Sequence, residues 1–83
     1  MLIGNRLNPR SVINTDLVTD YYKGRNLSSS GGLTHPKPYT ICFGFSGGTS
    51  DDQIYVKWEF EKEEDRDAQW SNLMGAMSVE FFD

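Results

Sequence analysis

The sequence has one cysteine, one histidine and three prolines among its 83 residues. A single thiol, Cys42, cannot close a disulfide within the chain or supply a multi-cysteine metal site. No apolar run approaches the roughly 18 residues that a membrane-spanning helix needs. The chain also opens without a basic stretch followed by an apolar one, so we expect no secretory leader, no membrane association and a reducing, cytoplasmic location.

The sequence also has few residues that suggest catalysis or cofactor binding. His35 and Cys42 lie seven positions apart, but no surrounding motif supports a nucleophilic pair. Asp51 and Asp52 follow a Gly-rich run that lacks both the spacing of a calcium loop and the lysine of a phosphate-binding loop. We expect these residues to form a turn. The sequence therefore predicts a protein that is not an enzyme and uses no cofactor or metal.

Charge is distributed unevenly along the chain. Residues 1–38 include five basic and two acidic residues, a net charge of +3, whereas residues 39–83 include three basic and ten acidic residues, a net charge of −7. The whole chain has a net charge of −4. Because an acidic surface repels phosphate backbones and anionic lipids, direct binding of nucleic acid or membranes by the second half is disfavoured.

The second half predicts a strand hairpin followed by a helix. Residues 39–45 and 54–61 alternate apolar and polar side chains, which is typical of half-buried strands. The Gly-, Ser- and Asp-rich residues 46–52 are expected to join them as an antiparallel hairpin. Four apolar residues then recur at helical spacing, which predicts a helix across the apolar face of the strands: Trp70, Leu73, Met74 and Met77. Residues 78–82 are expected to add a closing strand.

Two tryptophans fall on the predicted interface between strand and helix. Trp58 lies on the apolar face of the second strand, and Trp70 begins the apolar stripe of the helix. Large aromatic side chains dominate the burial of small cores. We therefore expect both indole rings to be largely buried.

The first half is expected to contribute one strand, one helix and a long loop. A short strand is expected within residues 1–7. A helix is expected from Asn8 to Lys23, because Asn can cap free amides, Pro is tolerated at the first helical position and Gly24 can end the helix. The Ser-, Gly- and Pro-rich residues 25–38 are expected to form a long exposed loop.

These elements together predict a single α+β domain over residues 1–83. Their order is the ferredoxin-like βαββαβ arrangement, with an antiparallel sheet of three to four strands and two helices on one face. The alternative without the first strand is α-β-β-α-β. Many unrelated functions share this order of elements, so the fold alone does not decide the activity.

Acidic residues cluster at the start of the second predicted helix. Six carboxylates are expected to lie close together there: Glu59, Glu61, Glu63, Glu64, Asp65 and Asp67. One interpretation is structural, since the helix dipole favours carboxylates at a helix N-terminus. The other is a docking surface, since a field of carboxylates would steer a protein with a basic surface.

The sequence thus predicts a small acidic protein-binding module. Regulators and inhibitors encoded by phages and mobile elements are examples of this class, in which the module occupies a basic site on a target protein. One alternative is an assembly subunit that forms a homo-oligomer through a sheet edge. Another is a nucleic-acid-binding module, for which Tyr55 and Lys57 on the outer sheet face are suitable whereas Glu59 and Glu61 beside them are not.

Overall fold

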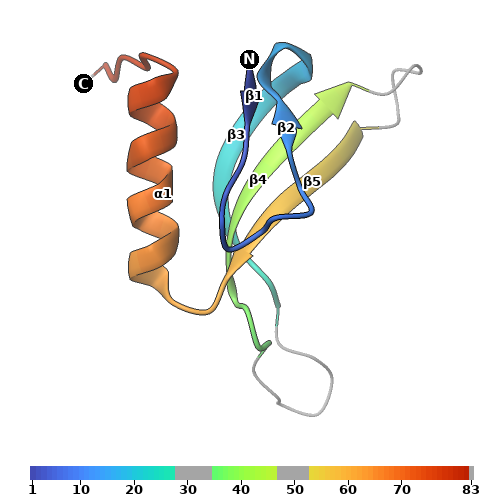
Figure 1. Ribbon diagram of the computed structural model, residues 1–83, viewed down its shortest axis with the longest axis vertical. Coiled ribbons are helices and arrows are strands. Elements are labelled where there is room, and N and C mark those ends of the chain that lie inside the picture. Colours follow the sequence, from blue (N-terminus) through green and yellow to red (C-terminus); the bar gives the residue numbers. More distant parts are fainter. Residues whose placement is uncertain (28–34, 47–52, 83) are drawn as a thin grey trace.

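The computed structural model describes residues 1–27, 35–46 and 53–82. A three-stranded antiparallel sheet lies at its centre, with strands in the order β3-β4-β5: β3 is Val18–Arg25, β4 is Tyr39–Ser46 and β5 is Gln53–Phe60. One α-helix, α1 (Glu63–Ala76), lies beside the sheet (Figure 1). No helix in the described ranges is long and apolar enough to cross a membrane.

The N-terminal residues form a second, smaller sheet. β1 (Leu2–Ile3) pairs antiparallel with β2 (Ile13–Asn14), and a 3-10 turn at Thr15–Leu17 leads directly into β3. Ile13 of this hairpin and Leu73 of α1 belong to the same buried cluster. The N-terminal hairpin and α1 therefore cover the same face of the three-stranded sheet (Figure 1).

The core lies between the three-stranded sheet and this covering layer. Alternation along β4 and β5 places four buried side chains on one face: Ile41, Phe43, Trp58 and Phe60. Phe43 packs edge to face against Trp58, with ring centres 4.8 Å apart, and against Tyr21 at 5.7 Å. The central strand therefore supplies the residue around which the aromatic rings of both edge strands pack.

The hairpin and helix predicted for the second half of the chain are confirmed. β4 and β5 pair antiparallel in continuous register, from Tyr39 opposite Phe60 to Ser46 opposite Gln53. Their connection, which includes Asp51 and Asp52, lies outside the described residues. Of the two tryptophans, Trp58 is buried as predicted, whereas Trp70 is only partly buried at the edge of the core.

The helix predicted from Asn8 to Lys23 is wrong. Residues 18–25 instead form β3, which pairs antiparallel with β4 along its whole length apart from one irregularity near Asp20. This stretch is rich in β-branched and aromatic residues, which pack well on a pleated sheet. Pairing with β4 also satisfies its backbone groups and buries part of Tyr21, and these tertiary gains outweigh the local capping signals at Asn8.

The ferredoxin-like βαββαβ order and its α-β-β-α-β alternative are also wrong. The described residues contain one α-helix in place of two, and the first strand is reduced to Leu2–Ile3. Residues 78–82 do not join the sheet, because Ser78, two residues after the end of α1, has a φ of 54° and the Val79 amide donates to the Met74 carbonyl at 3.1 Å. This left-handed helix end turns the chain away from the strands.

The loop predicted over residues 25–38 connects two strands and begins later than expected. Arg25 is the last residue of β3. The Asn26 amide donates to the Pro38 carbonyl at 2.8 Å, which closes the base of the connection between β3 and β4. Residues 28–34 lie outside the described residues, so the structure describes only the two ends of this loop.

Candidate functional site

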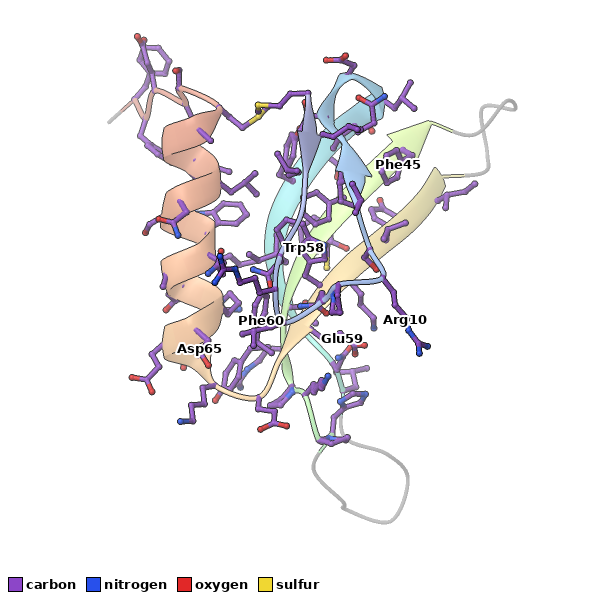
Figure 2. All side chains as sticks on the ribbon, viewed as in Figure 1. Arg10, Phe45, Trp58, Glu59, Phe60 and Asp65 are labelled. Atoms are coloured by element: carbon purple, nitrogen blue, oxygen red, sulfur yellow. The ribbon has the colours of Figure 1, made fainter. Side chains whose placement is uncertain are left out.

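Acidic side chains line a cleft where β5 passes into α1. The cleft has a volume of about 190 Å³, and five residues line it: Leu7, Lys37, Glu59, Glu61 and Asp65. Figure 2 shows Glu59 on β5 and Asp65 on the first turn of α1, near the same end of the molecule. We call this site the acidic cleft. It brings together three of the six carboxylates that the sequence predicted.

The short connection between β5 and α1 positions these carboxylates. Phe60, the last residue of β5, is 1 % exposed and anchors the strand end in the core. Only Glu61 and Lys62 separate it from the first residue of α1. Three acidic residues follow in the first turn of the helix, where the helix dipole favours negative charge. The anchored strand and the helix start therefore hold Glu61 and Asp65 at one corner of the fold.

Glu59 is held in place by both its backbone and its carboxylate. Its amide donates to the Asn8 side-chain oxygen at 2.9 Å, and its carbonyl accepts from the Asn8 side-chain amide at 3.1 Å. Its carboxylate accepts a hydrogen bond from Asn26 Nδ2 at 2.6 Å, and His35 Nε2 lies 3.9 Å away. Glu59 thus forms a fixed wall of the acidic cleft, linked to the N-terminal segment and to the β3–β4 connection.

Asn26 connects this wall to the basic residue of the cleft. Its side-chain amide donates to the Lys37 carbonyl at 2.7 Å, and its side-chain oxygen accepts from Lys57 Nζ. The Lys37 amide also donates to His35 Nδ1 at 3.0 Å. These contacts place Lys37 beside the cleft. No local pattern indicates this position, because the contacts of Asn26 join residues 11 to 33 positions apart in the chain.

Glu61 and Asp65 are the accessible carboxylates of the acidic cleft. Both side chains are exposed, and among the described residues neither forms an ion pair. No three His, Cys, Asp or Glu side chains in the described ranges are grouped closely enough to hold a metal ion. An organic cation, which can contact separated carboxylates through several N–H donors, fits this arrangement better than a metal ion.

The other three predicted carboxylates do not line the cleft. Glu63 and Glu64 are exposed on the first turn of α1, and a Glu63 carboxylate oxygen lies 3.8 Å from Arg66 Nη2. Asp67 lies near β3, where its carboxylate contacts Arg66 Nε at 2.6 Å and Lys23 Nζ at 3.7 Å. Asp67 is therefore part of the contact between helix and sheet. Glu63 and Glu64 contribute only to the negative electrostatic potential around the acidic cleft.

Arg66 links the start of α1 to β3, an edge strand of the sheet. Its side chain is buried, its Nη1 donates to the Gly24 carbonyl at 3.1 Å, and its guanidinium lies 5.4 Å from the centre of the Tyr39 ring. The Asp67 carboxylate partly balances the buried charge. Because the first turn of α1 is fixed in this way, the position of Asp65 in the acidic cleft is fixed as well.

The hydrogen bond from Arg66 holds the pKa of the Asp67 carboxyl below its usual value of 3.8, with smaller contributions from the charges of Arg66 and Lys23. Because the pKa is lower in the folded state, ionised Asp67 stabilises the fold above about pH 3.8, and this contribution is lost as the pH falls below that value.

Asp67→Asn should therefore be less stable than the wild type near neutral pH, and the difference in stability between the two proteins should shrink in acid. Thermal unfolding of both proteins from pH 7 to pH 2.5 measures this, and a difference independent of pH would contradict it.

A second hollow lies on the outer face of the sheet, with a volume of about 360 Å³. Tyr22 and Tyr55 pack edge to face across it, with ring centres 6.0 Å apart, and both remain close to half exposed. Cys42, opposite Tyr22 in the strand pairing, is buried, and its side-chain interaction with Tyr22 is the largest cause that raises the pKa of Tyr22. Two basic residues line the hollow: Lys57, which donates to Asn26, and the exposed Arg25, whose guanidinium lies 5.1 Å from the centre of the Tyr39 ring. The hollow therefore combines aromatic surface with two basic side chains that already contact neighbouring residues, which makes it less suited to phosphates than a hollow with unengaged cations.

The acidic cleft is thus the described site with the most definite chemistry. Its two accessible carboxylates can accept hydrogen bonds from a guanidinium or ammonium group, and Leu7 offers an apolar contact beside them. Glu59, already bonded to Asn26, supplies negative charge without needing to move.

Comparison with protein-family models, curated protein sequences and solved structures finds no match for this chain.

Proposed function

We propose that this protein is a small protein-binding module, a regulator or inhibitor, that holds a basic side chain of its target in the acidic cleft. The observation that carries the proposal is that Glu61 and Asp65, both exposed and without an ion pair in the described ranges, line one cleft together with Glu59. Arginine is the side chain best matched to the cleft, because its planar guanidinium has five N–H donors and pairs with carboxylates in bidentate geometry.

The dimensions and the lining of the cleft support a single long side chain as its occupant. An arginine or lysine buries its aliphatic stem against apolar surface while its charged end reaches polar groups. Leu7 supplies that apolar surface, and Glu61 and Asp65 supply the acceptors. Lys37 also lines the cleft and would repel an incoming cation, so the occupant should approach from the side of the carboxylates.

The wider charge distribution supports a basic partner. Residues 39–83 have a net charge of −7, and Glu63 and Glu64 lie on the helix turn that carries Asp65. Such a field steers a basic protein towards the surface and raises its association rate, and salt screens it. The field would bring the partner to the molecule, and the acidic cleft would fix its orientation.

Pairing of sheet edges, the alternative route to self-assembly, receives less support. On β5 the Asn8 side chain already bonds both backbone groups of Glu59, and on β3 the Arg66 guanidinium already bonds the Gly24 carbonyl. An incoming strand would have to displace these side chains. Proteins commonly protect exposed sheet edges by covering them in this way.

Binding of a capped Gly-Arg-Gly tripeptide, followed by NMR, tests the proposal with a defined probe. We expect the peptide to shift the amide resonances of Glu59, Glu61 and Asp65 and the side-chain amide of Asn26. Affinity should be weak, with a dissociation constant of about 10–100 mM, because exposed ion pairs contribute only about 0.2–1 kcal/mol each. The shifts should diminish as salt is raised from 20 to 500 mM, because dissolved ions screen exposed charge pairs. The screening distance, the Debye length, is about 10 Å at 0.1 M and becomes shorter at higher salt.

The matched control is the same tripeptide with citrulline in place of arginine, which keeps the shape but removes the charge. We expect no saturable shifts at the cleft with this peptide. Equal shifts with both peptides, or shifts located only at the outer-face tyrosines Tyr22 and Tyr55, would show that the acidic cleft does not select a basic side chain.

A further inference from the structure

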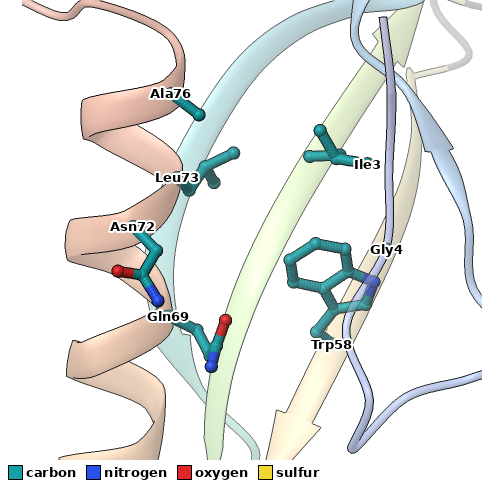
Figure 3. A pocket seen from close by; sticks show the side chains of 7 residues that line it. All are labelled: Ile3, Gly4, Trp58, Gln69, Asn72, Leu73 and Ala76. Atoms are coloured by element: carbon teal, nitrogen blue, oxygen red, sulfur yellow. The ribbon is translucent and has the colours of Figure 1, made fainter.

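An apolar groove separates β1 from α1, at the opposite end of α1 from the acidic cleft. It has a volume of about 170 Å³ and is lined mainly by Ile3, Gly4, Trp58, Leu73 and Ala76. Figure 3 shows Ile3 and Leu73 pointing towards each other across it, with the Trp58 indole ring below Ile3 on the strand side and Ala76 above Leu73 on the helix. We call this site the apolar groove. A cavity of about 150 Å³ with apolar walls is known to be large enough for a benzene ring, so the groove has room for one phenyl side chain.

The residues that follow α1 expose apolar side chains that the fold does not use. Phe81 is 73 % exposed and Phe82 is 90 % exposed, and Val79 before them is 42 % exposed. We call residues 78–82 the C-terminal segment. Phe81 and Phe82 therefore leave two aromatic rings largely in contact with solvent, where a partner could bury them.

The C-terminal segment is directed away from the apolar groove of its own chain. The left-handed conformation of Ser78 and the hydrogen bond from Val79 to Met74 turn the chain at the end of α1. Figure 1 shows the segment leaving α1 on the side opposite the N-terminal hairpin, whereas the groove lies between α1 and that hairpin. With this turn in place, residues 78–82 do not line the groove of their own chain.

We propose that the apolar groove binds the C-terminal segment of a second copy of this chain. Phe82, the more exposed of the two phenylalanines, fills the groove, and Phe81 packs at its rim. Gln69 and Asn72 on the α1 wall of the groove have side-chain amides that can hydrogen-bond the backbone of the incoming segment. The exchange is reciprocal about a two-fold axis, so it closes as a dimer with two equal contacts.

Sedimentation velocity over a range of protein concentrations tests the proposal. We expect the wild type to pass from monomer to dimer as concentration rises, and Phe81→Ser/Phe82→Ser to weaken the dimer by roughly tenfold or more, because each buried phenyl ring contributes substantially to association. Salt should not weaken this dimer, in contrast to binding at the acidic cleft, because the contact is apolar.

A matched pair of helix variants separates the groove from the rest of the surface. Ala76 lines the apolar groove and Ala68 does not, yet both are exposed alanines on α1. Ala76→Leu should fill the groove and weaken the dimer, whereas Ala68→Leu should leave it unchanged. Both are helix-compatible changes, so circular dichroism should show the same fold in each.

Mixing two impaired variants gives a direct readout of the exchange. Ala76→Leu keeps its C-terminal segment, and Phe81→Ser/Phe82→Ser keeps its groove, so the mixture should form heterodimers with one intact contact. A wild type that stays monomeric at the highest concentration, equal effects of Ala76→Leu and Ala68→Leu, or a mass that grows without limit in place of a dimer would each overturn the proposed reciprocal exchange.

Discussion

Trp58→Ala should unfold most of the protein at room temperature or lower its melting temperature by more than about 12 °C. Trp58 is 3 % exposed, packs edge to face against Phe43 at 4.8 Å and donates from Nε1 to the Ser11 carbonyl at 2.8 Å. Removing a buried tryptophan costs about 3–5 kcal/mol, and each kcal/mol corresponds to roughly 4–8 °C for a domain of this size. Domains are stable by only about 5–15 kcal/mol, so the loss is a large fraction of the total.

Thermal and urea unfolding measure this loss, and two further variants show its origin. Trp58→Phe keeps an aromatic ring against Phe43 and removes the hydrogen bond to Ser11, so it should cost less, about 1–2 kcal/mol. Trp70→Ala should also cost less, roughly 1–2 kcal/mol, because Trp70 is only partly buried. A Trp58→Ala melting temperature within a few degrees of the wild type would show that the core is not centred on this ring.

Glu61→Lys/Asp65→Lys should slow association with a basic partner by at least about tenfold. The double variant replaces both accessible carboxylates of the acidic cleft with cations, so it removes the acceptors and reverses the local field. Glu59 and Asp67 are left unchanged because both bond to neighbouring elements of the fold. A peptide with several arginines serves as the probe, with stopped-flow fluorescence to follow association at several salt concentrations.

The matched control is Glu64→Lys/Glu80→Lys, which changes the net charge by the same amount outside the cleft. We expect it to slow association by a smaller factor, because it weakens the long-range field but leaves the acidic cleft intact. The wild-type rate should fall as salt rises. Equal effects of the two double variants would assign the binding to overall charge, and a wild-type rate indifferent to salt would rule out electrostatic steering.

The two proposed sites would act together in one assembly. The acidic cleft lies at the start of α1 and the apolar groove near its end, so reciprocal exchange at the groove leaves both clefts accessible. A dimer would then present two acidic clefts to a partner that carries two basic side chains. Linked sites bind more tightly than single ones when the partner can span them, because the second contact forms at a high effective concentration.

The sequence by itself determined the hairpin of β4 and β5 and the helix α1. Their side chains alternate with a period of two and then of 3.6, so the local pattern identifies the face that must be buried before any partner is known. The same pattern assigned Trp58 to the core. It also identified a run of carboxylates at the start of α1, because charge and order along the chain are local properties.

Only the tertiary structure decided the first half of the chain and the composition of the acidic cleft. Val18–Arg25 became β3 because pairing with β4 satisfied its backbone, a gain that no local signal contains. The cleft likewise depends on contacts across long stretches of sequence, such as those from Asn26 to Glu59 and from Arg66 to Gly24. As a result, Glu59, Glu61 and Asp65 line the cleft, whereas Asp67 helps to hold α1 against the sheet. Residues close in sequence on a helix can face different neighbours in space, so their order along the chain does not separate these two roles.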